Sequence, residues 1–346
     1  MRSAFAAFAL LCALAIAATA AHAQRMPRYK ALRFDQLLGW GQDDHAAALR
    51  AFLISCPDIS APEWAPICAF GASQTNAKAF FETFFTPVVV RPGSQALFTG
   101  YFEPDLDGSR TQQGRYQYPI YRMPKAYLKT GAAMPTRQEI DNGTLKGMNL
   151  EIAWVDDPVE AYYLHIQGSG RINLTDGTTV RVGYAGENGH VYRSAAQEMV
   201  RQGLITYAQA SIEGIRNWVS RNPQRGQLAL QNNSSYVFFR ELKNHDLSLG
   251  LMGALDRPIT ALRTIAVDPK YTQLGAPVWL EKGGQFAMRR LVIAQDVGSA
   301  IKGPQRADIF FGTGDIAGKL AGQTKNGGGM VVLLPIAIAN RLAPEG

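Results

Sequence analysis

Histidine and cysteine are scarce in this chain of 346 residues, which contains five histidines and three cysteines. Because His165 and His190 stand at no spacing typical of metal ligands, we predict neither a metal nor a cofactor. A dense run of lysine and arginine is also absent, which argues against a nucleic-acid-binding protein although the formal net charge is +7. The positive charge instead suits a protein that meets acidic polymers or lipid headgroups.

Long hydrophobic runs are missing apart from one near the N-terminus. Low-complexity tracts and short-period repeats are missing as well, which excludes disordered and solenoid proteins. The apolar run at residues 4–18 is too short and too rich in alanine for a membrane span. Arg2 precedes the run and an Ala21-His22-Ala23 cleavage site ends it, so residues 1–23 are predicted to be a signal peptide. We therefore expect an exported protein with no transmembrane span in its mature chain.

Removal of this signal would delete Cys12. This cysteine does not indicate a lipoprotein, because Leu11 stands where lipid-attachment signals carry a small residue. Cys56 and Cys68 would remain in an oxidising compartment, where a disulfide between them is favoured as much as two buried thiols. The sequence does not give the distance between their Cα atoms, so both alternatives stay open.

The hydrophobic pattern changes twice along the chain. Apolar residues recur at helical spacing over residues 34–85, and short β-rich runs dominate from Val88 onward. We predict a mainly β protein with a helical N-terminal segment, in which a barrel domain is interrupted by a second, inserted β-rich domain. The predicted barrel domain is discontinuous, at residues 24–107 and 242–346, and the inserted substrate-cleft domain covers residues 108–241.

Within the insert, the pattern predicts a hairpin around Thr175-Asp176-Gly177-Thr178 and two helices. The second helix is expected to start after a Thr206 cap and to stop at Pro223. The first helix is expected at 194–201. The predicted strands of the insert are at 118–121, 151–155, 160–167, 171–174 and 179–182, with one more short aromatic strand within 232–240. In the barrel, a last strand is predicted at 330–334 after the Gly-rich residues 326–329.

Three aspartates, Asp268, Asp296 and Asp308, follow or interrupt short runs of β-forming residues, where aspartate is usually depleted. Hydrophobic residues flank Asp308 in the sequence, and desolvation would raise its pKa and suit it to donate a proton near neutral pH. Asp296 is either an orienting partner for Asp308 or a turn cap. Asp268, which precedes Pro269, is expected to be structural.

Several long motifs resemble one known family. AVDPKYTQLGAPVWL and AQDVGSAIKGPQRADIFFG are similar to the three-aspartate domain, a double-psi β-barrel. Together with FTGYFEP, LHIQGSGRI, GYAGENGHVYRS and NNSSYVFFRE, in the same order over about residues 99–318, they resemble the membrane-bound lytic murein transglycosylase A family. The helical segment before Val88 carries no matching motif.

The resemblance implies an enzyme that cleaves the β-1,4 bond between N-acetylmuramic acid and N-acetylglucosamine in peptidoglycan. The C6 hydroxyl of the muramic acid would attack its own C1 and form a 1,6-anhydro product, so that a single carboxyl, Asp308 of the Arg306-Ala307-Asp308 motif, serves as acid and base. It further implies a periplasmic protein, associated with the outer membrane or cell wall, whose partners are peptidoglycan glycan strands and other cell-wall enzymes.

Candidate glycan contacts are aromatic or hydrogen-bonding side chains and small residues that let the backbone approach a sugar. Lys302 joins them as a cation that offsets carboxylate charge. Of the set, Glu103 is the strongest rival acid, although its loop setting suggests a solvated carboxylate. The full set is Tyr101, Glu103, Gln167, Gly168, Ser169, Tyr184, Tyr236 and Lys302.

The chain departs from the family pattern at two turns and in its N-terminal region. The turn after Asp296 is Val297-Gly298-Ser299, where the family commonly has Thr-Gly-Gly, and the closing Trp-Gly is Phe311-Gly312 here. The familiar lipid anchor is also missing. Two alternatives remain open at this point: a non-catalytic, expansin-like glycan-binding protein, and an inverting hydrolase that uses Asp308 with Asp296 or Glu103.

Overall fold

The structure, a computed structural model, describes residues 28–91, 95–243 and 249–343. The predicted signal peptide lies outside the described residues. Within this part of the chain, no helix is both long enough and apolar enough to cross a membrane.

Six strands close into a β-barrel. Their order is β14-β11-β12-β10-β13-β3, and a second pairing of β14 with β3 completes the ring. β1 and β2 extend the sheet beyond β14, and helix α11 packs against β3 and β13. The elements of this part are β1 (Arg28–Ala31), β2 (Phe85–Arg91), β3 (Ala96–Glu103), β10 (Thr264–Val267), β11 (Pro277–Lys282), β12 (Met288–Val297), β13 (Arg306–Thr313), α11 (Gly314–Gly322), β14 (Lys325–Pro335) and α12 (Ile336–Leu342).

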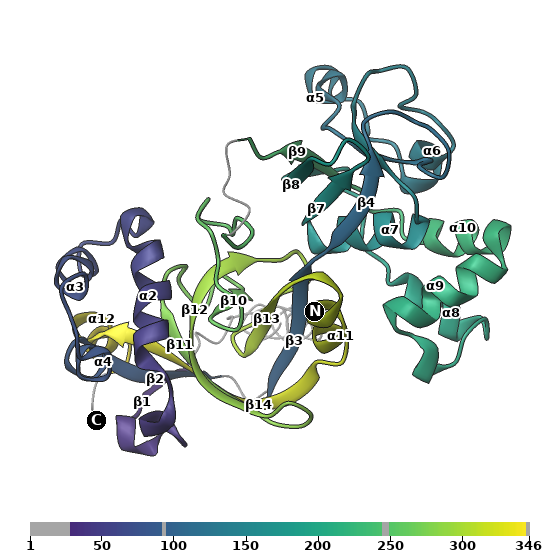
Figure 1. Cartoon of the computed structure of the whole chain (residues 1–346). Helices are drawn as coiled ribbons and strands as arrows, with labels where there is room; N and C mark the ends of the chain where they lie inside the picture. Colours follow the sequence, from purple (N-terminus) through teal and green to yellow (C-terminus); the bar gives the residue numbers. More distant parts are fainter. Residues whose placement is uncertain (1–27, 92–94, 244–248, 344–346) are drawn as a thin grey trace, which may run out of the picture.

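Short helices precede the barrel, at the end of the molecule opposite the insert (Figure 1). Phe52 is fully buried against Trp64, Phe80 and Phe81, and these rings belong to the same hydrophobic core as the barrel strands. The segment also contains a disulfide between Cys56 and Cys68. Its elements are η2 (Phe34–Gln36), η3 (Trp40–Gln42), α2 (His45–Ser55), η4 (Cys56–Asp58), α3 (Ala65–Gly71) and α4 (Ala77–Phe84).

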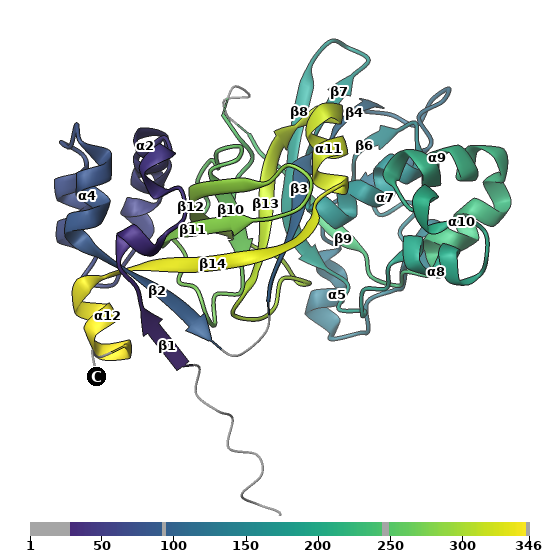
Figure 2. The same ribbon diagram turned by 90° about the horizontal axis from the view of Figure 1, so that it is seen from below.

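The chain between the barrel strands β3 and β10 forms a second sheet with its own helices. Figure 2 shows the helices α8, α9 and α10 on the far side of this insert from the barrel. The strand order is β5-β6-β4-β7-β8-β9. The elements are β4 (Asp105–Ser109), β5 (Tyr118–Tyr121), α5 (Lys125–Thr130), α6 (Arg137–Asp141), β6 (Glu151–Val155), α7 (Pro158–Gln167), β7 (Ser169–Leu174), β8 (Thr179–Glu187), α8 (Ala195–Arg201), η5 (Tyr207–Gln209), α9 (Ile212–Arg221), α10 (Pro223–Gln231) and β9 (Val237–Glu241).

This arrangement confirms the predicted fold class, a β-barrel that follows a helical segment and is interrupted by an inserted domain with a β-sheet. The predicted domain boundaries stay a proposal. Since β4 already belongs to the second sheet, we propose that the insert begins near Asp105 and ends near Glu241.

The prediction of a strand at residues 160–167 was wrong, because this segment is the helix α7. Asp157 caps the helix by accepting hydrogen bonds from the amides of Val159 and Glu160, and Pro158 stands at the first helical position. Tyr162 of this helix is buried and belongs to the core. Local capping therefore outweighed β-propensity here.

The predicted helix after Thr206 was also partly wrong. Only a short 3-10 turn follows Thr206, and α9 starts at Ile212 after a Ser211 cap. Pro223 does not simply stop a helix but begins α10, because proline at a first helical position lacks only an amide that would have no partner. The Gly-rich residues 326–329 lie inside β14, where they pair with β3 and β11.

Candidate active site

Two of the three aspartates lie in one row across the barrel. Ala266 in β10 pairs with Asp296 in β12 on one side and with Asp308 in β13 on the other, and Asp308 in turn pairs with Thr99 in β3. Paired residues point to the same face of a sheet, so both carboxylates and the Thr99 hydroxyl face the same side. Two strand spacings place the aspartate Cα atoms about 10 Å apart, and the small, buried Ala266 lies between them.

A β-bulge puts Asp296 into this row. The pairing of β10 with β12 runs from Ile265 opposite Ala294 directly to Ala266 opposite Asp296, so Gln295 has no partner in β10. Because side chains alternate between faces, regular pairing would have turned Asp296 to the other side of the sheet.

Asp308 has one carboxylate oxygen engaged. The hydroxyl of Thr99 donates to Oδ1 at 2.5 Å, and the guanidinium of Arg306 donates to the same hydroxyl oxygen at 2.7 Å. Since Thr99 accepts from Arg306, its own proton is directed at Asp308. The other oxygen of Asp308 has no hydrogen-bond partner among the described residues, which leaves it free to hold a proton and meet a substrate.

Asp296 is held by several donors. The hydroxyl of Tyr101 donates to Oδ2 at 2.8 Å, and the amide of Val297 donates to Oδ1 at 2.9 Å. Tyr101 is three strands away in the sheet order, so the curvature of the barrel brings the two side chains together. These donors favour the ionised carboxylate.

The face that carries the row is apolar. The buried side chains of Tyr101, Ala266, Phe310, Leu251, Ile259 and Ile301 form one cluster there. Burial raises the pKa of Asp308, opposed by the Thr99 hydroxyl and by the charge of Arg306. Burial also raises the pKa of Asp296 to about 6, against its hydrogen bonds, and the charge of Asp308 adds to the rise. Burial and the charge of Asp296 raise the pKa of Tyr101, which therefore remains a donor.

Glu103 is not the solvated carboxylate that its loop-like sequence suggested. It is the last residue of β3 and is fully buried, in a bidentate ion pair with Arg181 of β8 whose closest contact is 2.8 Å. The hydroxyl of Thr313 also donates to it at 2.8 Å. This pair joins the barrel to the insert, and it leaves Glu103 no exposed oxygen with which to reach a substrate.

Gln167, Gly168 and Ser169 lie where the helix α7 ends and β7 begins. The side-chain oxygen of Gln167 accepts a hydrogen bond from the amide of Phe102 in β3, which fixes this turn to the barrel strand. Gly168 has a left-handed backbone with φ of 76°, and a side chain there would meet no atom within 4 Å. Ser169 is buried.

The other predicted contacts lie in different settings. Tyr184 is 51% exposed in β8, and Lys302 is exposed in the loop before β13. Tyr236 is buried against His165 and the guanidinium of Arg137 and is part of the insert core.

Asp268 stands outside the row and holds a turn. Its carboxylate accepts hydrogen bonds from the amides of Lys270 at 3.1 Å and Gly303 at 2.9 Å. The side chain is buried and both oxygens are engaged, which is the structural use that the following proline suggested.

Two members of the site, Thr99 and Ala266, were missed by sequence reasoning. The signal for Thr99 was available, because it stands two positions before Tyr101 in a strand and therefore on the same face. Nothing in the sequence marked Ala266 as a spacer. No group of three or more potential metal-ligand side chains is found in the part of the chain that the structure describes.

A cavity of about 540 Å³ lies elsewhere, inside the insert. It is bounded by β5, β6, α6, α7, α9 and α10, and neither aspartate of the row lines it. Its walls include Arg137, Tyr162, His165 and Tyr236, the same side chains that pack together in the insert core. The cavity is therefore separate from the carboxylate row.

Two known family domains match most of the chain from β3 to β14. The MltA specific insert domain matches residues 97–240, and the 3D domain matches residues 263–334. The Membrane-bound lytic murein transglycosylase A of Escherichia coli K12 is 35% identical over 246 residues, which cover 68% of this chain and 65% of that protein. The chain thus spans slightly less than two thirds of the length of this curated relative.

Solved structures match over most of the chain. The monoclinic crystal structure of MltA from Neisseria gonorrhoeae has a TM-score of 0.78 and 33% identity, covering 89% of this chain and 92% of that chain. A structure of E. coli MltA with bound chitohexaose has a TM-score of 0.73 and 26% identity, covering 89% and 94%. Each match covers about nine tenths of the chain and so extends beyond the two ranges that the family domains match.

Proposed function

Because the chain belongs to the MltA family, we propose that it is a lytic murein transglycosylase that cleaves the β-1,4 bond between N-acetylmuramic acid and N-acetylglucosamine in peptidoglycan. The products would carry 1,6-anhydromuramic acid. The observation that supports this most is the setting of Asp308, a carboxyl on an apolar face with one oxygen free of hydrogen bonds among the described residues.

Asp308 is the proposed acid and base. Its proton passes to the glycosidic oxygen as the bond to C1 of the muramic acid breaks. The C6 hydroxyl of the same sugar attacks C1, and its proton returns to the Asp308 carboxylate, so that no water is consumed. Ring geometry brings the nucleophile to the reacting carbon, which is why a second protein carboxylate is not needed as a nucleophile.

Asp296 is proposed to remain ionised beside this reaction. Hydrogen bonds from Tyr101 and Val297 stabilise its negative charge. That charge, about two strands from Asp308, stabilises the positive charge that develops at C1. Tyr101 thereby acts as a positioning residue.

The glycan is proposed to lie between the barrel and the insert. The E. coli relative was solved with chitohexaose, a chain of linked sugars, which supports a glycan as the ligand. In this chain the turn at Gln167 and Gly168 is tied to β3, the strand that carries Thr99 and Tyr101. We place Tyr184 and Lys302 at more exposed positions along this path as weaker contacts.

We further propose that the protein is exported to the periplasm and associates with the outer membrane or the cell wall. The membrane-bound designation of the relatives and the sequence of residues 1–23 support this location. Peptidoglycan glycan strands are the proposed partner, and association with other cell-wall enzymes follows as an expectation.

The test is digestion of purified peptidoglycan by the wild type and by Asp308→Asn, with products identified by mass spectrometry. We expect anhydromuramic ends from the wild type and a rate of their release about 10² to 10⁴ lower from Asp308→Asn. Asp107→Asn, which changes an exposed aspartate of the insert, is the matched control and should cleave normally. Reducing muramic acid ends would show a hydrolase instead. Glycan binding without cleavage, unchanged by Asp308→Asn, would show a binding protein.

A further inference from the structure

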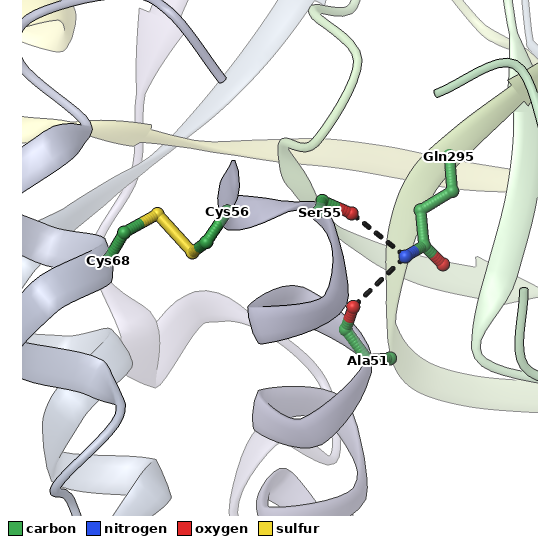
Figure 3. The surroundings of a disulfide bond; sticks show 5 residues. All are labelled: Ala51, Ser55, Cys56, Cys68 and Gln295. Atoms are coloured by element: carbon green, nitrogen blue, oxygen red, sulfur yellow. Dashed lines mark hydrogen bonds between the residues drawn. A yellow bond between two sulfur atoms is a disulfide. The ribbon is translucent and has the colours of Figure 1, made fainter. Parts of the chain in front are cut away.

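Gln295, the residue that has no partner in the bulge, is almost fully buried. Its side-chain amide nevertheless finds a partner for each polar hydrogen and for its oxygen. Nε2 donates to the carbonyl of Ala51 at 3.0 Å and to the hydroxyl of Ser55 at 2.8 Å, and Oε1 accepts from the hydroxyl of Thr264. Figure 3 shows the amide between the two acceptors of helix α2. An amide buried this way is fixed, since each bond lost would leave an unsatisfied group.

The backbone of Gln295 is tied to the reacting face as well. Its carbonyl accepts a hydrogen bond from the amide of Ala254 at 3.0 Å. A side chain at Gly253 would approach the same carbonyl to 2.6 Å, so the loop at residues 253–254 packs directly on the bulge. The bulge is therefore held from both sides of the sheet.

The acceptors on helix α2 are themselves fixed. Ser55 is the last residue of α2, and the next residue, Cys56, forms the disulfide with Cys68 (Figure 3). Asp58, two residues further, forms an ion pair with Arg257 in the loop that covers the site. Helix α2 lies outside both family-matched ranges, yet it is the element that reaches the residue before Asp296.

We propose that Gln295 is a positioning residue for the reaction, because its bonds to the C-terminal turn of α2 hold the bulge that turns Asp296 toward Asp308. This inference rests on the proposed function. Without the anchor, β12 can pair regularly with β10, and Asp296 would leave the row and Gln295 would enter it. The N-terminal helical segment thus has a role in catalysis beyond packing.

The variant that tests this is Gln295→Met, which keeps the length of the side chain and removes all three hydrogen bonds. We expect kcat on peptidoglycan glycan strands to fall at least tenfold with KM changed less than twofold, because the glycan contacts lie on other strands. In an Asp296→Asn background the same substitution should change kcat less than twofold, since the residue it positions has already been neutralised.

Val332→Ala in β14 is the matched control. It removes buried apolar contact in the same barrel, away from the row, and both variants are assayed at temperatures where they are equally folded. The control should retain kcat within twofold and keep the pH profile of the wild type. Gln295→Met should instead reproduce the pH profile of Asp296→Asn.

The inference would be overturned if Gln295→Met lowered kcat by the same factor in the wild-type and Asp296→Asn backgrounds. It would also be overturned if Val332→Ala lowered kcat as much as Gln295→Met does. If Gln295→Met does not fold, Ser55→Ala provides the same comparison, because it removes one acceptor of the amide and should give a smaller kcat loss that also disappears in the Asp296→Asn background. Failure of the proposed function is seen separately, as a wild type that releases no anhydromuramic ends.

Discussion

Replacement of Glu103 by glutamine is expected to destabilise the folded protein by about 3 to 5 kcal/mol, the usual cost of removing one partner from a buried ion pair. The Glu103 and Arg181 side chains are 0% and 1% exposed, and their closest atoms are 2.8 Å apart. Glutamine keeps the shape of the side chain but removes the negative charge that pairs with Arg181 in a region that water does not reach.

Urea unfolding monitored by tryptophan fluorescence measures this cost. We expect a lower midpoint with an unchanged slope. Asp107→Asn is the matched control, because it breaks an ion pair of the insert whose side chains are 61% and 60% exposed, and it should cost less than about 1 kcal/mol. The double variant Glu103→Leu with Arg181→Met should regain most of the lost stability, since no buried charge remains.

The Glu103→Gln variant also distinguishes a structural role of Glu103 from a catalytic one. Folded Glu103→Gln should cleave glycan strands within about tenfold of the wild-type rate, because the residue lacks access to substrate and the general acid is elsewhere. A stability loss below about 1 kcal/mol together with abolished cleavage would refute this reasoning and return Glu103 to the role of acid.

Three further outcomes are expected. Asp308→Asn should lower kcat by about 10² to 10⁴ without a change in the urea midpoint, and a loss of kcat below about tenfold in the folded variant would contradict its role as the acid. Thr99→Val removes a hydrogen-bond donor that lowers the pKa of Asp308, so the pKa of Asp308 should rise. Because the acid must be protonated to act, the alkaline limb of the pH–rate profile should move to higher pH, and a move to lower pH would be inconsistent with Asp308 as the acid. Cys56→Ser combined with Cys68→Ser, at a sequence separation of 12, should lower the free energy of unfolding by about 3 kcal/mol in urea titrations, whereas an unchanged midpoint would mean that the disulfide does not restrain the unfolded chain.

Sequence reasoning reached Asp308 partly for an inaccurate reason. Its apolar sequence neighbours, Ala307 and Ile309, belong to the main core and, as adjacent strand residues, point to the opposite face. The desolvation comes instead from residues on neighbouring strands, such as Ala266 and Tyr101. Adjacent residues in a strand do not surround one another, and only the pairing of strands shows which side chains do.

The sequence by itself determined the family motifs, the candidate carboxylates, the turn at Asp268 and the break in pattern that signals an inserted domain. These features depend on residues close together in the chain, where turn chemistry and motif spacing act locally. The helix α7 was missed even at this level, although its cap at Asp157 and Pro158 at its first position are local signals.

Tertiary structure alone decided which face each carboxylate occupies. Asp296 joins Asp308 only through the bulge at Gln295, and Glu103 is buried in an ion pair with Arg181, which lies 78 residues away in the sequence. The physical reason is that strand register and ion pairing across sheets are set by long-range packing. A shift of one residue in register reverses every side chain, and no local pattern in the sequence records it.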